Sequence, residues 1–176
     1  MASQDQAQAP QQRYIKPDTV AQWITDQPKR DDYLIIDVRS SDFPGGNLPG
    51  AVNITTKEFR NEESLDRLIQ RHILPHPSLR TIVVHCMRSQ TRGPYAAYLL
   101  SRAPSLPKNV DVVILEGGFQ GWLARFRGRG ELFEGLLGQD EAGVAGREEW
   151  EATVGAKEGE EKEAEDSRTL RGELRR

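Results

Sequence analysis

The stretch TIVVHCMRSQTRGPYAAYLL, residues 81–100, joins a β-branched apolar run to a helix-forming run through a short polar loop. Residues 81–86 predict a strand and residues 94–103 predict a helix. Pro94 suits the first turn of that helix, because the N–H that proline lacks would have no partner there. Between the two runs lie Cys86, the only cysteine of the chain, and Arg92, with five residues separating them. A thiol and a guanidinium therefore flank one strand-to-helix loop.

The segments on either side of this stretch show the same alternation of strand and helix. Short apolar runs predict three more strands, at residues 33–38, 51–54 and 110–116. Three more helices are predicted. A proline in the first turn indicates a helix at residues 16–24, the helical spacing of apolar residues indicates one at 63–73, and a glycine turn opens a short one at 117–126. We therefore expect an α/β fold in which helices cover both faces of a mostly parallel sheet. Ligands of such sheets bind at the carboxyl ends of the strands, where the sequence places Cys86.

Length and composition divide the chain of 176 residues into one domain and two tails. Residues 1–12 are rich in Gln and Ala and lack hydrophobic periodicity, so we expect a disordered arm. Residues 13–137 hold the alternating pattern and form the predicted folded domain. Residues 138–176 have few large apolar side chains and hold 12 acidic against 7 basic residues. We expect this segment to be an acidic, largely disordered tail.

Charge and hydropathy exclude several classes of protein. The formal net charge is −3, and the excess of acidic residues lies in the acidic tail. This distribution of charge gives no nucleic-acid-binding signature. No apolar run approaches the roughly 18 residues of a membrane-spanning helix, and the N-terminal segment lacks the apolar core of a secretory signal. A lone cysteine forms no internal disulfide and does not indicate an oxidising compartment. We expect a cytoplasmic protein, with the nucleus left open, and neither nucleic acid nor a membrane as partner.

The loop between the central strand and its helix has the composition of an anion-binding site. If the loop curls, the backbone N–H groups of five successive residues converge on one point: Met87, Arg88, Ser89, Gln90 and Thr91. The first turn of the helix adds unpaired N–H donors and the positive end of its dipole. Arg92 offers a planar guanidinium that matches two oxygens of a tetrahedral oxyanion. The same positive charge would stabilise a thiolate on Cys86 that is ready for in-line attack. The alternative interpretation is that this lone cysteine is a buried, inert thiol.

Three segments resemble the rhodanese superfamily and occur in its order: LIIDVRSSDFPGGNLPGAVNI (34–54), HCMRSQTRGP (85–94) and LEGGFQGW (115–122). The second resembles the C-x5-R phosphate-binding loop of cysteine phosphatases. Its RGP ending is like that of the M-phase inducer (cell-division-cycle) dual-specificity phosphatases and the related rhodanese-fold arsenate reductases. The resemblance implies a five-stranded, mostly parallel sheet, with Cys86 as nucleophile and Arg92 as transition-state clamp. Sulfur-transferring rhodaneses typically have a shorter loop, so the resemblance implies an oxyanion of phosphorus or arsenic.

Two positions depart from the family pattern. Asn47 stands where the superfamily usually has histidine, in a loop that concerns the scaffold. Thr91 stands where the M-phase inducer phosphatases have a glutamate that is proposed to help protonate the leaving group, and threonine is no acid near neutral pH. Asp42 is the remaining candidate for a proton donor. Asp37 and Arg39 are interpreted as structural, because their hydrogen bonds would fix the loop that follows their strand.

The histidines offer little evidence of further chemistry. His85 directly precedes Cys86, and we expect it to orient the loop or to tune the thiolate. His72 and His76 have the spacing of zinc ligands on a helix, but prolines interrupt this segment and no third ligand is apparent. The sequence therefore predicts no metal site.

Four functions remain open at this point. The leading hypothesis is a phosphatase of protein-tyrosine or dual-specificity type that hydrolyses aryl phosphate esters through a Cys86 phosphoenzyme. The alternative is an arsenate reductase that uses Cys86 with external glutathione and glutaredoxin, because the chain has no second cysteine. Thiosulfate sulfurtransferase and a non-catalytic phosphopeptide-binding module are less favoured. The expected substrate is a phosphorylated protein or a small oxyanion, with no resident cofactor and with glutaredoxin as partner of the reductase alone.

Overall fold

The computed structural model describes residues 12–26 and 31–136, and within them five strands form one sheet. The strands are β1 (Tyr14–Ile15), β2 (Tyr33–Asp37), β3 (Val52–Asn53), β4 (Thr81–His85) and β5 (Asp111–Leu115). Their order is β1-β5-β4-β2-β3, and every neighbouring pair is parallel. The predicted parallel sheet is confirmed, with β4 at its centre.

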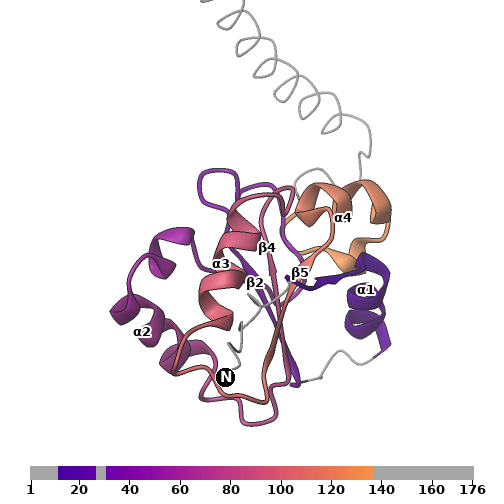
Figure 1. Cartoon of the computed structure of the whole chain (residues 1–176). Coiled ribbons are helices and arrows are strands. Elements are labelled where there is room, and N and C mark those ends of the chain that lie inside the picture. The colour runs from indigo at the N-terminus through magenta and orange to yellow at the C-terminus, as the bar shows by residue number, and fades with distance from the viewer. Residues whose placement is uncertain (1–11, 27–30, 137–176) are drawn as a thin grey trace, which may run out of the picture. The chain divides into compact units, whose positions relative to one another are not determined.

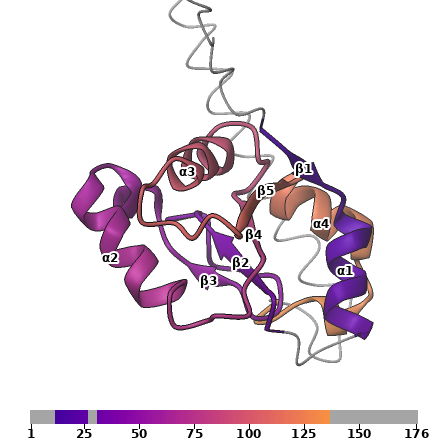
Figure 2. The same ribbon diagram turned by 60° about the horizontal axis from the view of Figure 1, so that its bottom comes forward.

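Helices cover the sheet on both faces (Figure 1). One layer contains α2 (Glu62–His72), α3 (Arg92–Ser101) and the 3-10 helix η1 (Thr56–Phe59). The other layer contains α1 (Pro17–Asp26), α4 (Gly118–Phe126) and the 3-10 helix η2 (Gly130–Leu132). Figure 2 shows α2 and α3 on one side of the strands and α1 and α4 on the other. The expected three-layer α/β architecture is therefore present.

The central strand β4 shows why two helical layers are needed. Ile82 and Val84 belong to the apolar cluster under α2 and α3, whereas Val83 points to the opposite face, because side chains alternate along a strand. All three side chains are completely buried. Burial of each is worth about 1.5–3 kcal/mol. A strand that is apolar on both faces is therefore stable only when helices cover both faces.

Two features of the fold differ from the sequence prediction. β1 is not predicted, because a strand of two residues is too short to show hydrophobic periodicity; it extends the sheet by pairing with β5. α3 begins at Arg92, ahead of the predicted start at residue 94, with Thr91 as its N-cap. Pro94 lies in the first turn, as predicted. Arg92 is consequently fixed on the first turn of a helix and not in the loop.

The predicted arm, residues 1–12, lies outside the described residues except for Gln12, and the predicted tail, residues 138–176, lies entirely outside them. Gln12 donates from its side-chain amide to the carbonyl oxygen of Pro94 at 3.0 Å, at the start of α3. In the part of the chain that the structure describes, no helix has the length and apolar character needed to span a membrane.

Candidate active site

The segment from Cys86 to Arg92 connects the carboxyl end of β4 to the first turn of α3. Two other connections leave the same edge of the sheet, because β2 and β5 flank β4 and run parallel to it. The connection after β2 contains Asp42, and the connection after β5 contains Gly117, which is followed by Gly118 as the first residue of α4. The predicted position of Cys86, at the carboxyl end of a buried strand, is confirmed.

The start of α4 fixes the first half of this loop. The backbone N–H groups of Phe119 and Gln120 donate to the carbonyl oxygens of Cys86 and Met87, at 2.9 and 2.8 Å. Gly118 permits this approach, because its φ is +58° and a Cβ there would lie 2.5 Å from the Cys86 oxygen. In a trans peptide the N–H points opposite to the preceding C=O. The N–H groups of Met87 and of the residue after it therefore point away from α4.

The backbone N–H groups of the loop are mostly unpaired. Those of Met87, Ser89, Gln90 and Thr91 donate to no acceptor within residues 12–26 and 31–136. Ser89 has a φ of +53°, and the left-handed turn that it makes curls the loop. Ser89 is only 3% exposed, and its Oγ has no hydrogen-bond partner among the described residues. Unpaired donors on a curled loop are the components of an anion-binding nest.

Cys86 lies where the apolar core meets this loop. It is 4% exposed, carries a free thiol and belongs to the cluster under α2 and α3. Gly93, in the first turn of α3, packs directly against it: a Cβ on Gly93 would lie 3.3 Å from the Cys86 backbone nitrogen. The N-terminus of α3 therefore begins beside Cys86, where the helix dipole favours negative charge.

Arg92 forms an end-on ion pair with Asp42, 50 residues away in the sequence. Nη1 and Nη2 of Arg92 donate to Oδ1 and Oδ2 of Asp42, at 2.8 and 2.5 Å. The hydrogen bond to Arg92 is the main cause that lowers the pKa of Asp42 to about 2. The same bond is the main cause that raises the pKa of Arg92, and the charges of Cys86 and Asp37 contribute in the same direction. Arg92 and Asp42 therefore hold each other in their charged forms.

The expectation that Asp42 donates a proton does not fit this ion pair. A carboxyl group with a pKa of about 2 is ionised near neutral pH and holds no proton to transfer. The sequence did not indicate the arginine that stabilises its charge. Asp42 contacts the predicted clamp for the oxyanion instead.

A fully buried ion pair between Asp37 and Arg39 supports this edge of the sheet. Nε of Arg39 donates to both carboxylate oxygens of Asp37, at 3.0 and 2.8 Å. Its Nη1 and Nη2 donate to the carbonyl oxygens of Asp42 and Gly46, at 3.2 and 2.7 Å. The guanidinium carbon also lies 4.0 Å from the ring centroid of Phe119. These contacts confirm the structural interpretation, since Arg39 ties the loop after β2 to the end of that strand.

His85 is completely buried between this ion pair and Cys86. Its Nδ1 lies 3.2 Å from the carbonyl oxygen of Cys86, and because a carbonyl only accepts, Nδ1 carries the proton. Burial lowers the pKa of His85, while the carboxylate of Asp37, 3.7 Å from Nε2, opposes this change. His85 is therefore neutral near neutral pH. Its contact with the Cys86 backbone fits the predicted role of orienting the loop.

Further contacts surround the loop and its neighbour after β2. Arg88 is exposed, and its Nε donates to Oε1 of Gln120 at 2.9 Å. No sequence signal indicates Gln120, because a contact between a loop and the next helix has no local pattern. Asn47 exchanges backbone hydrogen bonds with Glu134 and donates its side-chain amide to the carbonyl oxygen of Leu48. These contacts agree with a scaffold role for Asn47.

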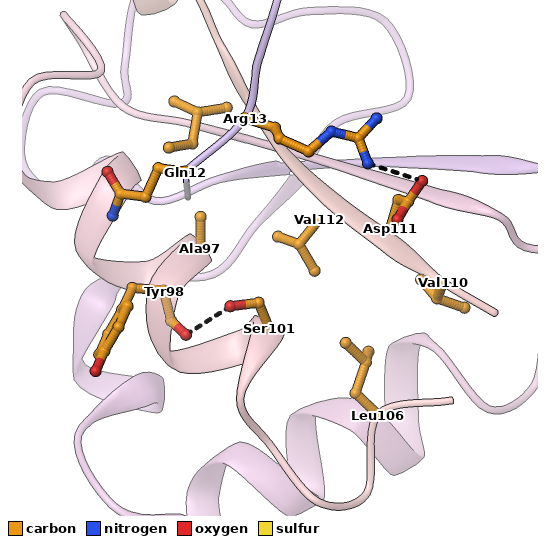
Figure 3. A pocket seen from close by; sticks show the side chains of 10 residues that line it. Gln12, Arg13, Ala97, Tyr98, Ser101, Leu106, Val110, Asp111 and Val112 are labelled. Carbon is orange, nitrogen blue, oxygen red and sulfur yellow. Dashed lines mark hydrogen bonds and ion pairs between the residues drawn. The ribbon is translucent and has the colours of Figure 1, made fainter. Parts of the chain in front are cut away.

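A pocket of about 200 Å³ between α3 and β5 is separate from this site (Figure 3). Its wall contains no residue of the segment from Cys86 to Arg92. Polar groups in the wall have partners already: the Ser101 hydroxyl donates to the Tyr98 carbonyl at 2.9 Å, and Arg13 pairs with Asp111 at 3.2 Å. Across residues 12–26 and 31–136, no group of three or more His, Cys, Asp or Glu side chains is placed to hold a metal ion.

Comparison with known proteins agrees with this fold. The dual specificity phosphatase ibp1 of Schizosaccharomyces pombe is 32% identical over 139 residues, which cover 69% of this chain and 95% of the relative. The solved structure of a yeast protein tyrosine phosphatase of the rhodanese family has a TM-score of 0.61 at 28% identity, over 71% of this chain and 93% of that one. The As-Sb reductase from Leishmania major has a TM-score of 0.60 at 26% identity, over 74% of this chain and 90% of that one. The family model for the rhodanese-like domain matches residues 20–125, and the chain therefore belongs to the rhodanese-like domain family.

Proposed function

We propose that the protein is a cysteine-dependent phosphatase that hydrolyses aryl phosphate esters such as phosphotyrosine, with Cys86 as nucleophile and Arg92 as clamp. The observation that carries this proposal is the curled loop between the two residues, whose backbone N–H groups are mostly unpaired among the described residues. A dual specificity phosphatase and a protein tyrosine phosphatase among the similar proteins support the same reaction.

The first chemical step transfers the phosphoryl group to sulfur. The Cys86 thiolate attacks phosphorus in line, the S–P bond forms and the P–O bond to the aryl group breaks. Negative charge on the three equatorial oxygens is stabilised by the guanidinium of Arg92 and by unpaired N–H groups of the loop, those of Met87, Ser89, Gln90 and Thr91. The N-terminus of α3 adds the positive end of its dipole.

The leaving group departs without an assigned proton donor. Thr91 has no acidic proton near neutral pH, and the pKa of about 2 keeps Asp42 ionised. An alcohol that leaves as an alkoxide is a far poorer leaving group than a phenol that leaves as a phenolate. Aryl phosphates are therefore the substrate class that suits this site, and a phosphotyrosine side chain of a protein belongs to that class.

The second step hydrolyses the phosphocysteine. Water attacks phosphorus, the S–P bond breaks, and Cys86 leaves as a thiolate that the α3 N-terminus stabilises. The same N–H groups and Arg92 stabilise the transition state again. Inorganic phosphate is released and the free enzyme is restored.

A second candidate is arsenate reduction, which the structural similarity to the As-Sb reductase favours. Cys86 would displace water from arsenate to form a thiol–arsenate adduct. An external thiol such as glutathione would attack the Cys86 sulfur, so that two electrons pass to As(V), arsenite leaves and a mixed disulfide forms. A second external thiol, such as glutaredoxin, would release Cys86, because the chain holds no other cysteine.

The deciding experiment compares the wild type with Cys86→Ser on two substrates under reducing conditions. The phosphatase predicts hydrolysis of an aryl phosphate that disappears in the variant. Arsenate turnover with glutathione and glutaredoxin, but no phosphate release, would assign the reductase instead. The absence of both activities would contradict both assignments.

The same protein samples test the two remaining functions. Thiocyanate formation from thiosulfate and cyanide would indicate sulfur transfer. Phosphopeptide binding that survives Cys86→Ser, without any turnover by the wild type, would indicate a binding module.

A further inference from the structure

We infer that Asp42 is a positioning residue that holds the guanidinium of Arg92 in the orientation needed by the transition state. The inference rests on the proposed role of Arg92 as the oxyanion clamp. In this role Asp42 stays bound to Arg92 throughout the reaction, contacts no substrate atom and transfers no proton.

The geometry of the ion pair leaves one edge of the guanidinium available. Asp42 occupies the end of the group through Nη1 and Nη2. A guanidinium has five N–H donors, and two of them lie along the edge formed by Nε and Nη2. Nε of Arg92 donates to no acceptor in the described parts of the chain. Two oxygens of a phosphoryl group can therefore bind at this edge while the carboxylate keeps its place.

Asp42 is itself held by the structure beneath it. Its Oδ1 accepts from the backbone N–H of Ser40 at 3.0 Å, and its carbonyl oxygen accepts from Nη1 of Arg39 at 3.2 Å. Arg39 is completely buried and bound to Asp37 at the end of β2. A continuous series of contacts thus runs from the sheet through Asp37, Arg39 and Asp42 to Arg92. An arginine has a long flexible side chain, and this series restricts it to one orientation.

The contribution of this ion pair to stability is expected to be small. The side chains of Arg92 and Asp42 are 35% and 30% exposed, and partly exposed pairs gain little free energy against the solvent. The pKa of about 2 keeps Asp42 charged at every physiological pH, so the contact persists. Its effect is therefore expected in the geometry of the clamp and not in the free energy of unfolding.

Loss of the carboxylate should affect the transition state more than the bound substrate. Asp42→Asn removes a negative charge beside a bound anion, which favours ground-state binding and offsets the poorer orientation of Arg92. In the transition state the equatorial oxygens must align with the guanidinium edge, and misplaced groups cost up to about 100-fold in rate. A positioning role thus predicts a lower kcat with little change in KM.

The first experiment measures kcat and KM of Asp42→Asn with p-nitrophenyl phosphate and with phenyl phosphate. We expect kcat to fall about tenfold or more for both substrates by the same factor, with KM changed by less than about threefold. Asp18→Asn is the matched control, because Asp18 forms a similar two-bonded pair with Arg125 on the surface, at 2.8 and 2.6 Å. We expect this control to keep wild-type kinetics.

Three outcomes would overturn the inference. A lower KM with unchanged kcat would mean that Asp42 competes with the substrate for Arg92. A loss that is larger for phenyl phosphate than for p-nitrophenyl phosphate would make Asp42 the proton donor. Unchanged kcat and KM would mean that the ion pair has no catalytic consequence. If Asp42→Asn does not fold, Asp42→Ser carries the same expectations.

A second measurement separates this inference from the proposed function. Orthovanadate mimics the transition state, whereas phosphate does not. For each anion, the measurement gives the concentration that protects Cys86 from alkylation by iodoacetamide. We expect Asp42→Asn to weaken protection by vanadate about tenfold and to leave protection by phosphate nearly unchanged. Equal protection by vanadate in both proteins would overturn the inference. Because this readout needs no turnover, it holds even if the wild type hydrolyses no phosphate ester and the proposed function fails.

A double-mutant cycle shows whether Asp42 acts through Arg92. In an Arg92→Ala background, Asp42→Asn is expected to cause no further loss of vanadate protection. The same loss in both backgrounds would mean that Asp42 acts independently of the guanidinium, which contradicts the positioning role.

Discussion

Gly118 lies so close to Cys86 that a Cβ on the glycine would stand 2.5 Å from the carbonyl oxygen of the cysteine. The first turn of α4 and the loop after β4 therefore determine each other's position, although they are distant in the sequence. The carbonyl groups of Cys86 and Met87 face α4, and this orientation turns the following N–H groups the other way. The shape of the proposed oxyanion cradle thus depends on a helix that contributes no catalytic group.

Gly118→Ala is expected to abolish this arrangement. A left-handed backbone costs an L-residue about 1–2 kcal/mol, and the clash with the Cys86 oxygen must in addition displace the loop or the helix. We expect lower stability in urea unfolding together with a loss of oxyanion protection of Cys86. Gly128→Ala is the control, because Gly128 has a φ of +93°, yet a Cβ added there would have no atom of the described residues within 4 Å. Equal losses of oxyanion protection in the two variants would contradict the role of the close contact.

The buried pair of Asp37 and Arg39 predicts a large effect on stability. Asp37→Asn leaves the Arg39 guanidinium without its counter-charge at a site with no solvent exposure. Removal of one partner from a buried pair costs about 3–5 kcal/mol, which urea unfolding can measure. Asp111→Asn is the control, since its pair with Arg13 has side chains that are 63% and 64% exposed. A loss for Asp37→Asn no larger than that of the control would show that the buried pair is not structural.

The buried His85 predicts how stability depends on pH. Burial lowers the pKa of His85 in the folded chain below the ordinary value of 6.5 that it has in the unfolded chain. At a pH between these two pKa values, the unfolded chain binds a proton at His85 and the folded chain does not. The free energy of unfolding should therefore decrease as the pH falls below about 6.5. In His85→Asn this contribution is absent, while an amide can still donate to the Cys86 carbonyl. We expect a smaller loss of stability between about pH 7.5 and about pH 5.5 in the variant, measured by urea unfolding.

The half-buried His72 also has a pKa that burial lowers, and it therefore contributes to the same pH dependence. His72→Asn is the comparison variant, which is expected to lose this contribution and to keep that of His85. An identical dependence in His85→Asn and the wild type would show that His85 does not cause it.

The strands and the loop from Cys86 to Arg92 could be predicted because their signals are local. Ile82, Val83 and Val84 form a continuous β-branched run, and the spacing of Cys86 and Arg92 is visible in a single loop. A parallel sheet then places the loop at the carboxyl edge without any knowledge of distant contacts.

The partners of that loop could not be predicted because they come from other parts of the chain. The sequence leaves Asp42 as a candidate proton donor. Only the fold shows that Arg92 donates a hydrogen bond to each of its carboxylate oxygens. No local sequence pattern predicts the hydrogen bond between Gln120 and Arg88 either. β1 has too few residues for any periodicity.

The absence of an assigned proton donor predicts how the rate depends on the leaving group. Asp42 is ionised and Thr91 has no acidic proton, so in the proposed mechanism the aryl oxygen departs as an anion. General acid catalysis is worth about 10²–10⁴-fold, and substrates with poor leaving groups should show this loss in full. We expect kcat/KM to rise steeply as the pKa of the leaving phenol falls, across a series of substituted phenyl phosphates at constant pH. Thr91→Val removes the hydroxyl with little change in shape and should leave the slope unaltered. A flat series would reveal a proton donor elsewhere in the site, and a steeper slope in Thr91→Val would assign that function to the threonine hydroxyl.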